Sequence, residues 1–163
     1  MAESPQSLLI SHLTDAVAME ENVEQMLDGM IRTTEDERIR ARLERHRDET
    51  RNQAERLRGC LEAHGESSSG LKETVAKAGA AMKGMMDMAR GEKAGRNARD
   101  AYATEHMEIA AYQLLERVAR HAGDERSAEV ARRNRAEEEE MARFLDGCWD
   151  AAAERSLAEA GAR

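Results

Sequence analysis

The chain has 163 residues, of which 36% are charged, with a formal net charge of -8 and a pI near 5.3. This length fits one domain, and we expect a helical unit over residues 1–163 with its core at about 5–148 and a C-terminal tail at 149–163. The acidic balance argues against a nucleic-acid partner, because phosphate binding needs a basic face. No apolar run is long enough to cross a membrane, so we expect no membrane partner and a cytoplasmic location.

The composition predicts an all-helical fold with a thin core. Phe, Leu, Ile and Val together account for only 22 of the 163 residues, while Ala, Glu, Arg, Leu and Met, which are good helix formers, are abundant. One Phe, one Trp and two Tyr are too few aromatic residues for a sheet of any size. Cys60 and Cys148 are isolated and predict neither a disulfide framework nor a zinc site.

Two helices are expected before the first linker. Ser4 followed by Pro5 is typical of a helix start, and this first helix should run to about Arg32. The sequence "TEDE" at 34–37 predicts a capping box that opens a second helix, which should end near His64, before Gly65.

The second half of the chain should contain a crossover and two more long helices. "GESSSG" at 65–70 is a linker, and the glycine-interrupted stretch that follows, to Gly91, predicts a short crossover helix. The methionines within it are interpreted as apolar packing residues rather than copper ligands. A third helix is expected from about Ala98 to His121, and Asp124 should cap a fourth helix that reaches Cys148.

Two helical hairpins joined by a longer crossover are typical of the ferritin-like form of the four-helix bundle. On each predicted helix the buried stripe is interrupted by polar side chains. These candidates are Glu20, His46 with Glu49, Glu105 with Glu108, and either Glu137 or Glu138. Each of these residues also has an ordinary structural explanation when it is considered alone. Glu20 can lie at the edge of the buried stripe, and His46 can be a hydrogen-bonded core histidine. The run of four glutamates can form a solvent-exposed face.

Considered together, these side chains indicate one shared centre, because several unpaired buried carboxylates are costly unless cations neutralise them. Carboxylate oxygens with imidazole suit two divalent ions, iron or manganese, better than zinc. His106 adjoins Glu105 and is therefore about 100° around the helix. We interpret His106 as a helix contact beside the centre rather than as a ligand.

Five stretches between about Leu8 and Leu145 strengthen this interpretation: "LTDAVAMEENVEQML", "HRDETRNQAERL", "AAMKGMM", "EHMEIAAY" and "AEEEEMARFL". They resemble the YciE/YciF family of ferritin-like bacterial stress proteins. The resemblance implies a ferritin-like bundle, commonly dimeric, with a two-metal centre and no firmly established reaction. Residue by residue, it implies a metal-facing set: Glu20, His46, Glu49, Glu105, Glu108 and Glu138, with Glu137 as the rival of Glu138.

Two hypotheses of function follow. The first is a di-iron or di-manganese oxidoreductase, similar to a ferroxidase or peroxidase, which handles oxygen or peroxide in oxidative stress. Its partners would be the small oxidant and a second copy of the chain. The alternative is a metal-free structural or interaction dimer whose inner carboxylates pair with arginines.

Overall fold

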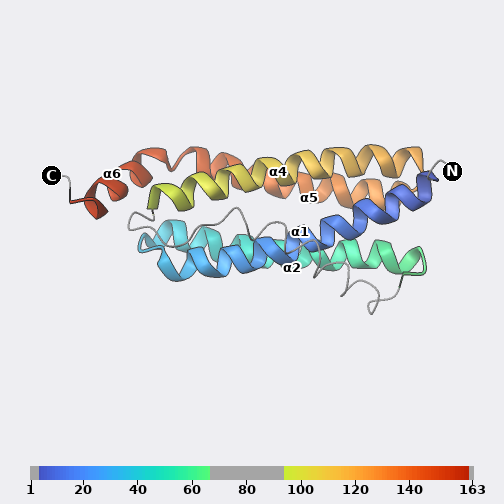
Figure 1. The fold of residues 1–163 in the computed structure, drawn as a ribbon, viewed down its shortest axis with the longest axis horizontal. Helices are drawn as coiled ribbons and strands as arrows, with labels where there is room; N and C mark the ends of the chain where they lie inside the picture. The colour runs from blue at the N-terminus through green and yellow to red at the C-terminus, as the bar shows by residue number, and fades with distance from the viewer. Residues whose placement is uncertain (1–3, 67–93, 162–163) are drawn as a thin grey trace.

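The computed structural model describes residues 4–66 and 94–161, and these residues form only α-helices, as the sequence predicts (Figure 1). The predicted crossover helix lies outside the described residues. The helices are α1 (Pro5–Thr33), α2 (Glu37–Ala63), α4 (Ala94–His121), α5 (Glu125–Asp146) and α6 (Trp149–Glu159).

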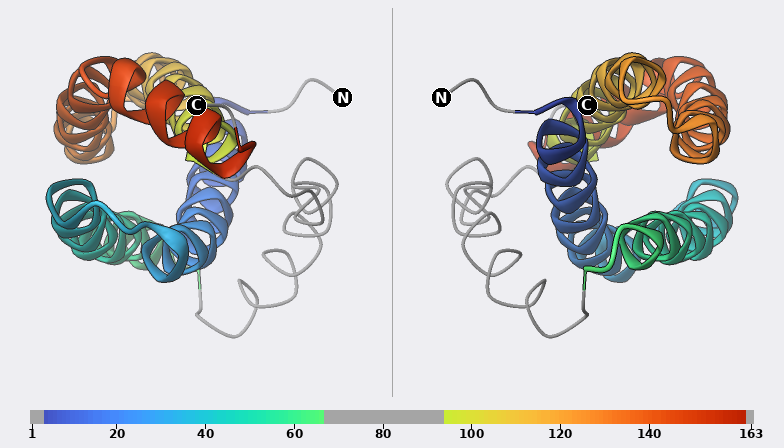
Figure 2. Two further views of the ribbon diagram at one scale, coloured as in Figure 1. Left: turned by 90° about the vertical axis from the view of Figure 1, so that its left-hand side faces the viewer. Right: turned by 90° about the vertical axis from the view of Figure 1, so that its right-hand side faces the viewer.

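The four long helices form a bundle of two antiparallel hairpins, α1 with α2 and α4 with α5. The hairpins meet where α1 contacts α4 and where α2 contacts α5. Helices α2 and α4 run in the same direction, as the colour gradient along the ribbon shows (Figure 1). The end views show the four helices arranged around a common axis (Figure 2). This is the ferritin-like arrangement that the order of predicted helices indicates.

The helix ends follow from local hydrogen bonding. Ser4 Oγ accepts from Ser7 N at 3.0 Å, with Pro5 in the first helical position. Gly65 and Gly123 adopt φ values of 82° and 75° directly after the turns that end α2 and α4. A residue with a Cβ rarely adopts such values, so both glycines suit these helix ends.

The predicted capping box at the start of α2 is wrong in its details. Asp36, not Thr34, is the N-cap, because its Oδ1 accepts from Ile39 N at 3.0 Å. Thr34 instead closes the end of α1, where its hydroxyl donates to the Met30 carbonyl at 2.8 Å. Thr34 thus closes α1 and Asp36 opens α2, while Glu35 between them pairs with Arg155 of α6.

The C-terminal part of the chain is more regular than the sequence indicates. α5 ends at Asp146, and after a break at Gly147 the expected tail forms α6, which packs against α4. Ser156 Oγ accepts from Gly95 N at 2.8 Å, so α6 satisfies a backbone donor in the first turn of α4. The described part of α4 starts at Ala94 and so includes residues before the predicted start at about Ala98.

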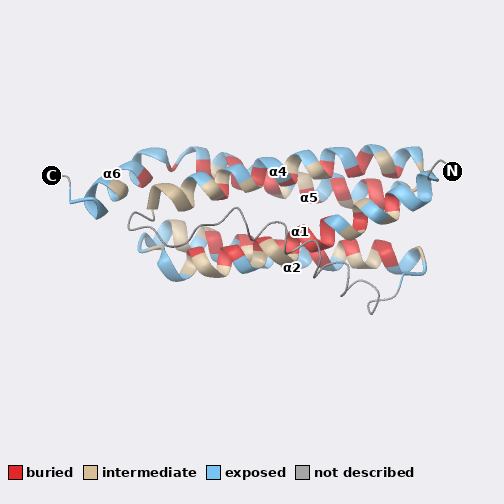
Figure 3. Ribbon diagram, viewed as in Figure 1, coloured by how far each residue is buried: buried red, intermediate tan, exposed pale blue. Residues whose placement is uncertain are grey.

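Buried residues recur along each of the long helices (Figure 3). The apolar ones among them form two clusters. The first cluster includes Leu9, Leu13, Leu57, Leu61, Tyr112 and Leu115. The second cluster includes Val23, Leu27, Met30, Leu43, Ala101, Met141 and Leu145. Each helix of the bundle passes from one cluster to the other through a buried polar stretch.

Candidate metal centre

The residues between the two clusters form a central polar layer that is closed to solvent. Its members come from all four long helices and have no exposed surface: Glu20, His46, Thr50, Gln53, Glu105, Glu108, Asn134 and Glu138. Charged residues are seldom fully buried unless they are paired. A layer with four carboxylates therefore requires an explanation beyond packing.

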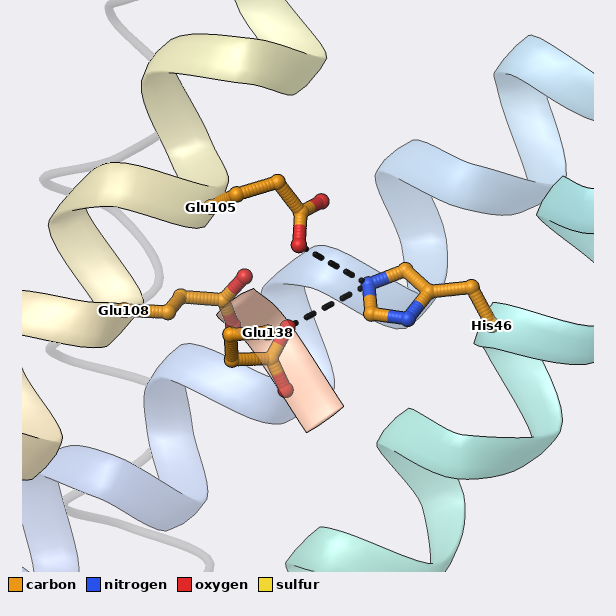
Figure 4. Close-up of side chains that lie close together, drawn as sticks. All are labelled: His46, Glu105, Glu108 and Glu138. Carbon is orange, nitrogen blue, oxygen red and sulfur yellow. Dashed lines mark ion pairs between the residues drawn. The ribbon is translucent and has the colours of Figure 1, made fainter. Parts of the chain in front are cut away.

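Four of these side chains converge on one point (Figure 4). His46, Glu105, Glu108 and Glu138 each offer a ligand atom, and these atoms all lie within 4.8 Å of one another. His46 Nε2 is 3.2 Å from Glu105 Oε2 and 3.4 Å from Glu138 Oε2. We call these side chains the four-residue group.

Helix geometry explains how α4 supplies two members of this group. Glu105 and Glu108 are three residues apart, so their side chains leave the same face of α4, about one turn apart. His46 extends from α2 on the opposite side of the bundle, and Glu138 extends from α5 between them (Figure 4). Three different helices therefore fix the positions of the four side chains.

The carboxylates of the four-residue group lack the partners that buried charges normally have. Neither oxygen of Glu105 or Glu108 has a hydrogen-bond partner among the described residues, and the same is true of Glu138 Oε2. Burial and the neighbouring Glu138, Glu20 and Glu105 raise the pKa of Glu108 well above its usual value. Burial likewise raises the pKa of Glu138, although the nearby His46 opposes the change.

His46 is oriented by Glu49, which lies on the other side of the imidazole ring. Nδ1 of His46 is 3.2 Å from Glu49 Oε2, so Nε2 faces the buried carboxylates. Burial alone lowers the pKa of His46, but Glu105, Glu49 and Glu138 more than reverse this and raise it to about 10. In the metal-free protein both ring nitrogens therefore carry protons at neutral pH, and a metal ion that displaces the Nε2 proton would leave Nδ1 donating to Glu49.

Glu49 is held outside the four-residue group by arginines. Arg42 Nη1 donates to Glu49 Oε2 at 3.1 Å, and Arg45 Nε donates to Oε1 at 2.9 Å. Burial raises the pKa of Glu49, but His46 and Arg42 outweigh it and lower the pKa to about 2. Glu49 is therefore an ionised carboxylate that contacts His46 from behind.

Glu20 lies in the same layer but is tied to a tyrosine. Its Oε1 accepts a hydrogen bond from the Tyr112 hydroxyl, and its Oε2 is buried without a partner. Burial raises the pKa of Glu20 to about 8, although Tyr112 and His46 lower it. Asn134 Nδ2 donates to the Tyr112 oxygen at 3.0 Å, and Arg56 Nε donates to Asn134 Oδ1 at 2.9 Å. These contacts position Glu20 beside the four-residue group.

The adjacent residues Glu137 and Glu138 have different surroundings. The Glu137 side chain is 24% exposed and pairs with Arg56. The Glu138 side chain has no exposed surface and lies near His46. Gln53 Nε2 reaches both, donating to Glu137 Oε2 at 3.0 Å and to Glu138 Oε1.

The structure thus brings together His46, Glu105, Glu108 and Glu138, with Glu20 beside them. It places Glu49 behind the histidine and Glu137 in an ion pair. His106 is exposed, and its ring contacts Tyr102 with centroids 4.5 Å apart, so it faces away from the four-residue group.

The sequence does not identify Gln53 and Asn134 as hydrogen-bond partners of the buried acids, and for Tyr112 it suggests only packing or a place beside a redox centre. One signal was present, since each lies on a buried stripe about one or two helical turns from a candidate ligand. Buried polar residues so close to buried acids indicate a hydrogen-bonded shell. Which side chain binds which acid depends on distances between helices and cannot be obtained from one stripe at a time.

The donor set fits a divalent metal ion of the harder, borderline kind. One imidazole nitrogen and several carboxylate oxygens are typical ligands of iron and manganese in helical bundles. The unpartnered oxygens of Glu105 and Glu108 are the positions that a cation would satisfy. The buried His/Glu group can therefore hold a metal ion.

Fold and site together define a ferritin-like helical bundle with a buried His/Glu group. Residues 4–158 match the family model described as a domain of unknown function, DUF892. This match covers most of the chain, so the protein belongs to that family. Among the described residues, no helix is both long and apolar enough to span a membrane.

Solved structures show the same fold. A protein from Xanthomonas campestris has a TM-score of 0.78 and 28% identity, with 97% of this chain and 99% of that chain covered. The Escherichia coli stress protein YciF has a TM-score of 0.70 and 21% identity, with 94% and 98% covered. YcfI of Rhodopseudomonas palustris, described as a candidate structural protein, has a TM-score of 0.68 and 23% identity, with 88% and 93% covered. The resemblance to the YciE/YciF family is thereby confirmed.

Proposed function

We propose that the protein binds two divalent transition-metal ions, iron or manganese, in the central polar layer. The observation that carries this proposal is the set of buried oxygens without partners on Glu105 and Glu108. Four buried carboxylates, those of Glu20, Glu105, Glu108 and Glu138, carry the charge that two divalent cations would neutralise. Without cations, burial of this many carboxylates is strongly unfavourable.

His46, Glu105, Glu108 and Glu138 would supply the main ligands, and Glu20 would contribute through its buried Oε2. We assign Glu49 a positioning role, because it contacts His46 Nδ1 while Nε2 faces the centre. A carboxylate on the non-ligating nitrogen fixes the ring orientation and increases the basicity of the ligating nitrogen. Glu49 thus remains part of the proposed centre in a different role from that of a ligand.

We further propose that the centre handles oxygen or peroxide, as a ferroxidase-like or peroxidase-like oxidoreductase in oxidative stress. When bound, iron or manganese would supply the redox change that such chemistry requires. The apolar clusters on both sides would limit access of water, and Tyr112 would hold Glu20 in place. The description of YciF as a stress protein supports this class of function.

Association into a homodimer remains a proposal as well. Met107 and Leu114 are 37% and 51% exposed and lie seven residues apart on the outer face of α4. Apolar side chains at this spacing can pack against another helix. Light scattering coupled to gel filtration should give twice the mass of the chain, and a monomer at all concentrations would exclude the dimer.

Metal analysis of the purified protein tests the central proposal. Protein expressed with iron or manganese should contain about two equivalents per chain, in keeping with dinuclear carboxylate sites. Glu105→Gln should remove most of this metal, whereas Glu137→Gln, in the ion pair with Arg56, should retain it. Glu49→Ala should weaken metal affinity about 10–100-fold, as expected for a residue that orients a ligand.

The alternative function is that of a metal-free structural or interaction protein. The description of YcfI as a candidate structural protein favours this possibility. It predicts that the purified protein contains no stoichiometric metal and is equally stable with and without a chelator. That result would contradict the metal-centre proposal and leave the helical scaffold as the functional part.

A further inference from the structure

The described residues contain a cavity that the proposed function does not yet use. It has a volume of about 540 Å³ and lies at the end of the bundle where the turn between α1 and α2, the start of α4, and α6 meet. This size is within the usual range for small-molecule pockets. We call it the axial cavity because it opens at one end of the bundle.

The floor of the axial cavity is apolar. Met30, Leu43, Ala101 and Leu145 line it, and all four belong to the second apolar cluster. Each is at most 4% exposed, so they lie at the bottom of the cavity rather than at its rim. The rim is mainly acidic and includes Glu35, Asp36, Glu154 and Glu159, with Arg155 paired to Glu35.

Only a thin wall separates this floor from the central polar layer. Leu43 precedes His46 by three residues, and Ala101 precedes Glu105 by four. With a helical rise of 1.5 Å per residue, these spacings correspond to about 4.5 Å and 6 Å along the helix axes. One helical turn on α2 and one on α4 thus lead from the cavity floor to two of the proposed ligands.

Two other approaches to the layer are occupied by side chains in the described part of the chain. Towards the opposite end of the bundle, the first apolar cluster extends along α2 from Leu57 to Leu61. On the side between α2 and α5, ion pairs join Arg45 to Glu140 and Arg56 to Glu137. Of these approaches, the axial cavity is the one with open volume among the described residues, and its floor lies about one helical turn from the layer.

We infer that the axial cavity is the entry route of a small neutral oxidant, dioxygen or hydrogen peroxide, and that Leu43 and Ala101 restrict its size. This inference rests on the proposed function. The apolar floor separates the cavity from the central polar layer by about one helical turn, so small uncharged molecules can pass through it when its side chains move. The acidic rim repels anionic oxidants. The structure thus limits the substrate class to small neutral species.

The first test uses metal-free protein and dissolved oxygen as the probe. Oxygen is paramagnetic and broadens the NMR signals of methyl groups that it approaches. We expect the methyl signals of Leu43, Ala101 and Leu145 to broaden several times more than those of Leu57 and Leu61. Equal broadening, or stronger broadening of the Leu57 and Leu61 signals, would overturn the inference, whether or not the protein binds metal.

The second test uses protein loaded with Fe(II) and follows its oxidation by stopped-flow absorbance. Each hydrogen peroxide accepts one electron from each of two Fe(II) ions and, with two protons, leaves as two water molecules. Ala101→Leu should slow oxidation several-fold with metal content unchanged. Leu43→Ala should accelerate oxidation by the bulky cumene hydroperoxide several-fold more than oxidation by hydrogen peroxide.

Leu57→Ala is the matched control, because it removes the same atoms from a buried leucine of α2 outside the cavity. Leu57→Ala should leave unchanged the ratio of the Fe(II) oxidation rate with cumene hydroperoxide to the rate with hydrogen peroxide. Unchanged rates in both cavity variants at full metal content, or an equal change in the control, would overturn the route. Absence of metal would instead overturn the proposed function, and the oxygen-broadening result would still decide the route.

Discussion

The central polar layer and the seam between α2 and α5 contain the same acidic residue type in different surroundings. In the seam, Glu137 pairs with Arg56 and Glu140 lies 3.4 Å from Arg45, both at partly exposed positions. In the layer, the buried oxygens of Glu105 and Glu108 have no hydrogen-bond partner among the described residues, and the basic group beside them is the His46 ring, 3.2 Å from Glu105 Oε2. The chain contains many arginines, yet none in the described part of the chain pairs with Glu105 or Glu108. The seam therefore stabilises the fold by itself, whereas the layer is suited to an added cation.

The largest expected effect is the response of the layer to metal. Binding to the folded state alone should raise the free energy of unfolding by ~4 kcal/mol per ion at a free metal concentration 1,000 times the dissociation constant. Thermal unfolding of chelator-treated protein, with and without Mn(II), measures this effect. An unchanged transition temperature at saturating Mn(II) would mean that the layer, like the seam, binds no stabilising cation.

A second prediction concerns the pH dependence of the metal-free protein. Glu20 has a pKa of about 8 in the folded protein, above the usual value of 4.5, and His46 has a pKa of about 10, above 6.5. In both cases the folded state keeps a proton that the unfolded state has lost. The free energy of unfolding should therefore fall as pH rises, by about 1.4 kcal/mol per pH unit for each such group. For Glu20 the window is about pH 4.5 to 8, and for His46 about 6.5 to 10.

Denaturant unfolding between pH 5 and 8 measures this slope. Glu20→Gln should flatten the decline, because glutamine does not titrate. Glu137→Gln, in the seam, should leave the slope as it is. A metal-free protein whose stability rises across this range would contradict the assigned protonation of Glu20.

The third prediction compares single carboxylates in the two regions. In metal-free protein at pH 8, Glu108→Gln should raise the free energy of unfolding by ~1–3 kcal/mol, because an unpartnered buried group is replaced by a neutral one. Glu137→Gln should lower it, since Arg56 then loses its ionic partner. Destabilisation by Glu108→Gln would indicate that this carboxylate has a favourable partner in the metal-free protein.

The smallest effect is expected at the exposed edge of the seam. The side chains of Arg45 and Glu140 are 63% and 56% exposed. Glu140→Gln should therefore change the free energy of unfolding by less than ~1 kcal/mol, with or without metal, because exposed ion pairs contribute little. Urea unfolding measures the change, and a larger loss would show that the seam matters more to the fold than its exposure indicates.

Much of the fold can be predicted from the sequence, because its helices carry strong local signals. Ser4 with Pro5, Asp124, Gly65 and Gly123 mark helix ends that the structure confirms. The exchange of cap roles between Thr34 and Asp36 could not be predicted, because both residues can cap a helix. α6 packs against α4, where Ser156 accepts from Gly95 N, and no local pattern in the sequence indicates this tertiary contact.

For the candidate site, the sequence predicts which residues are buried but not which partners they have. The helical period places Glu20, His46, Glu105 and Glu108 on inner faces, and the structure finds all four buried. The helical period alone does not show that Glu49 and Glu105 have different surroundings. Glu49 is paired because arginines at other positions of α2 reach it. The choice between Glu137 and Glu138 depends on the rotation of α5 relative to α2, which only the packed structure provides.

The most direct test of the central claim is the location of bound metal in crystals of the Mn(II)- or Fe(II)-loaded protein. Anomalous diffraction at the absorption edge of the metal locates the ions without any assumption about their ligands. If the proposed centre is correct, anomalous peaks should lie in the central polar layer, among His46, Glu105, Glu108 and Glu138. Peaks confined to surface carboxylates, or a fully loaded crystal with no peak in the layer, would contradict it.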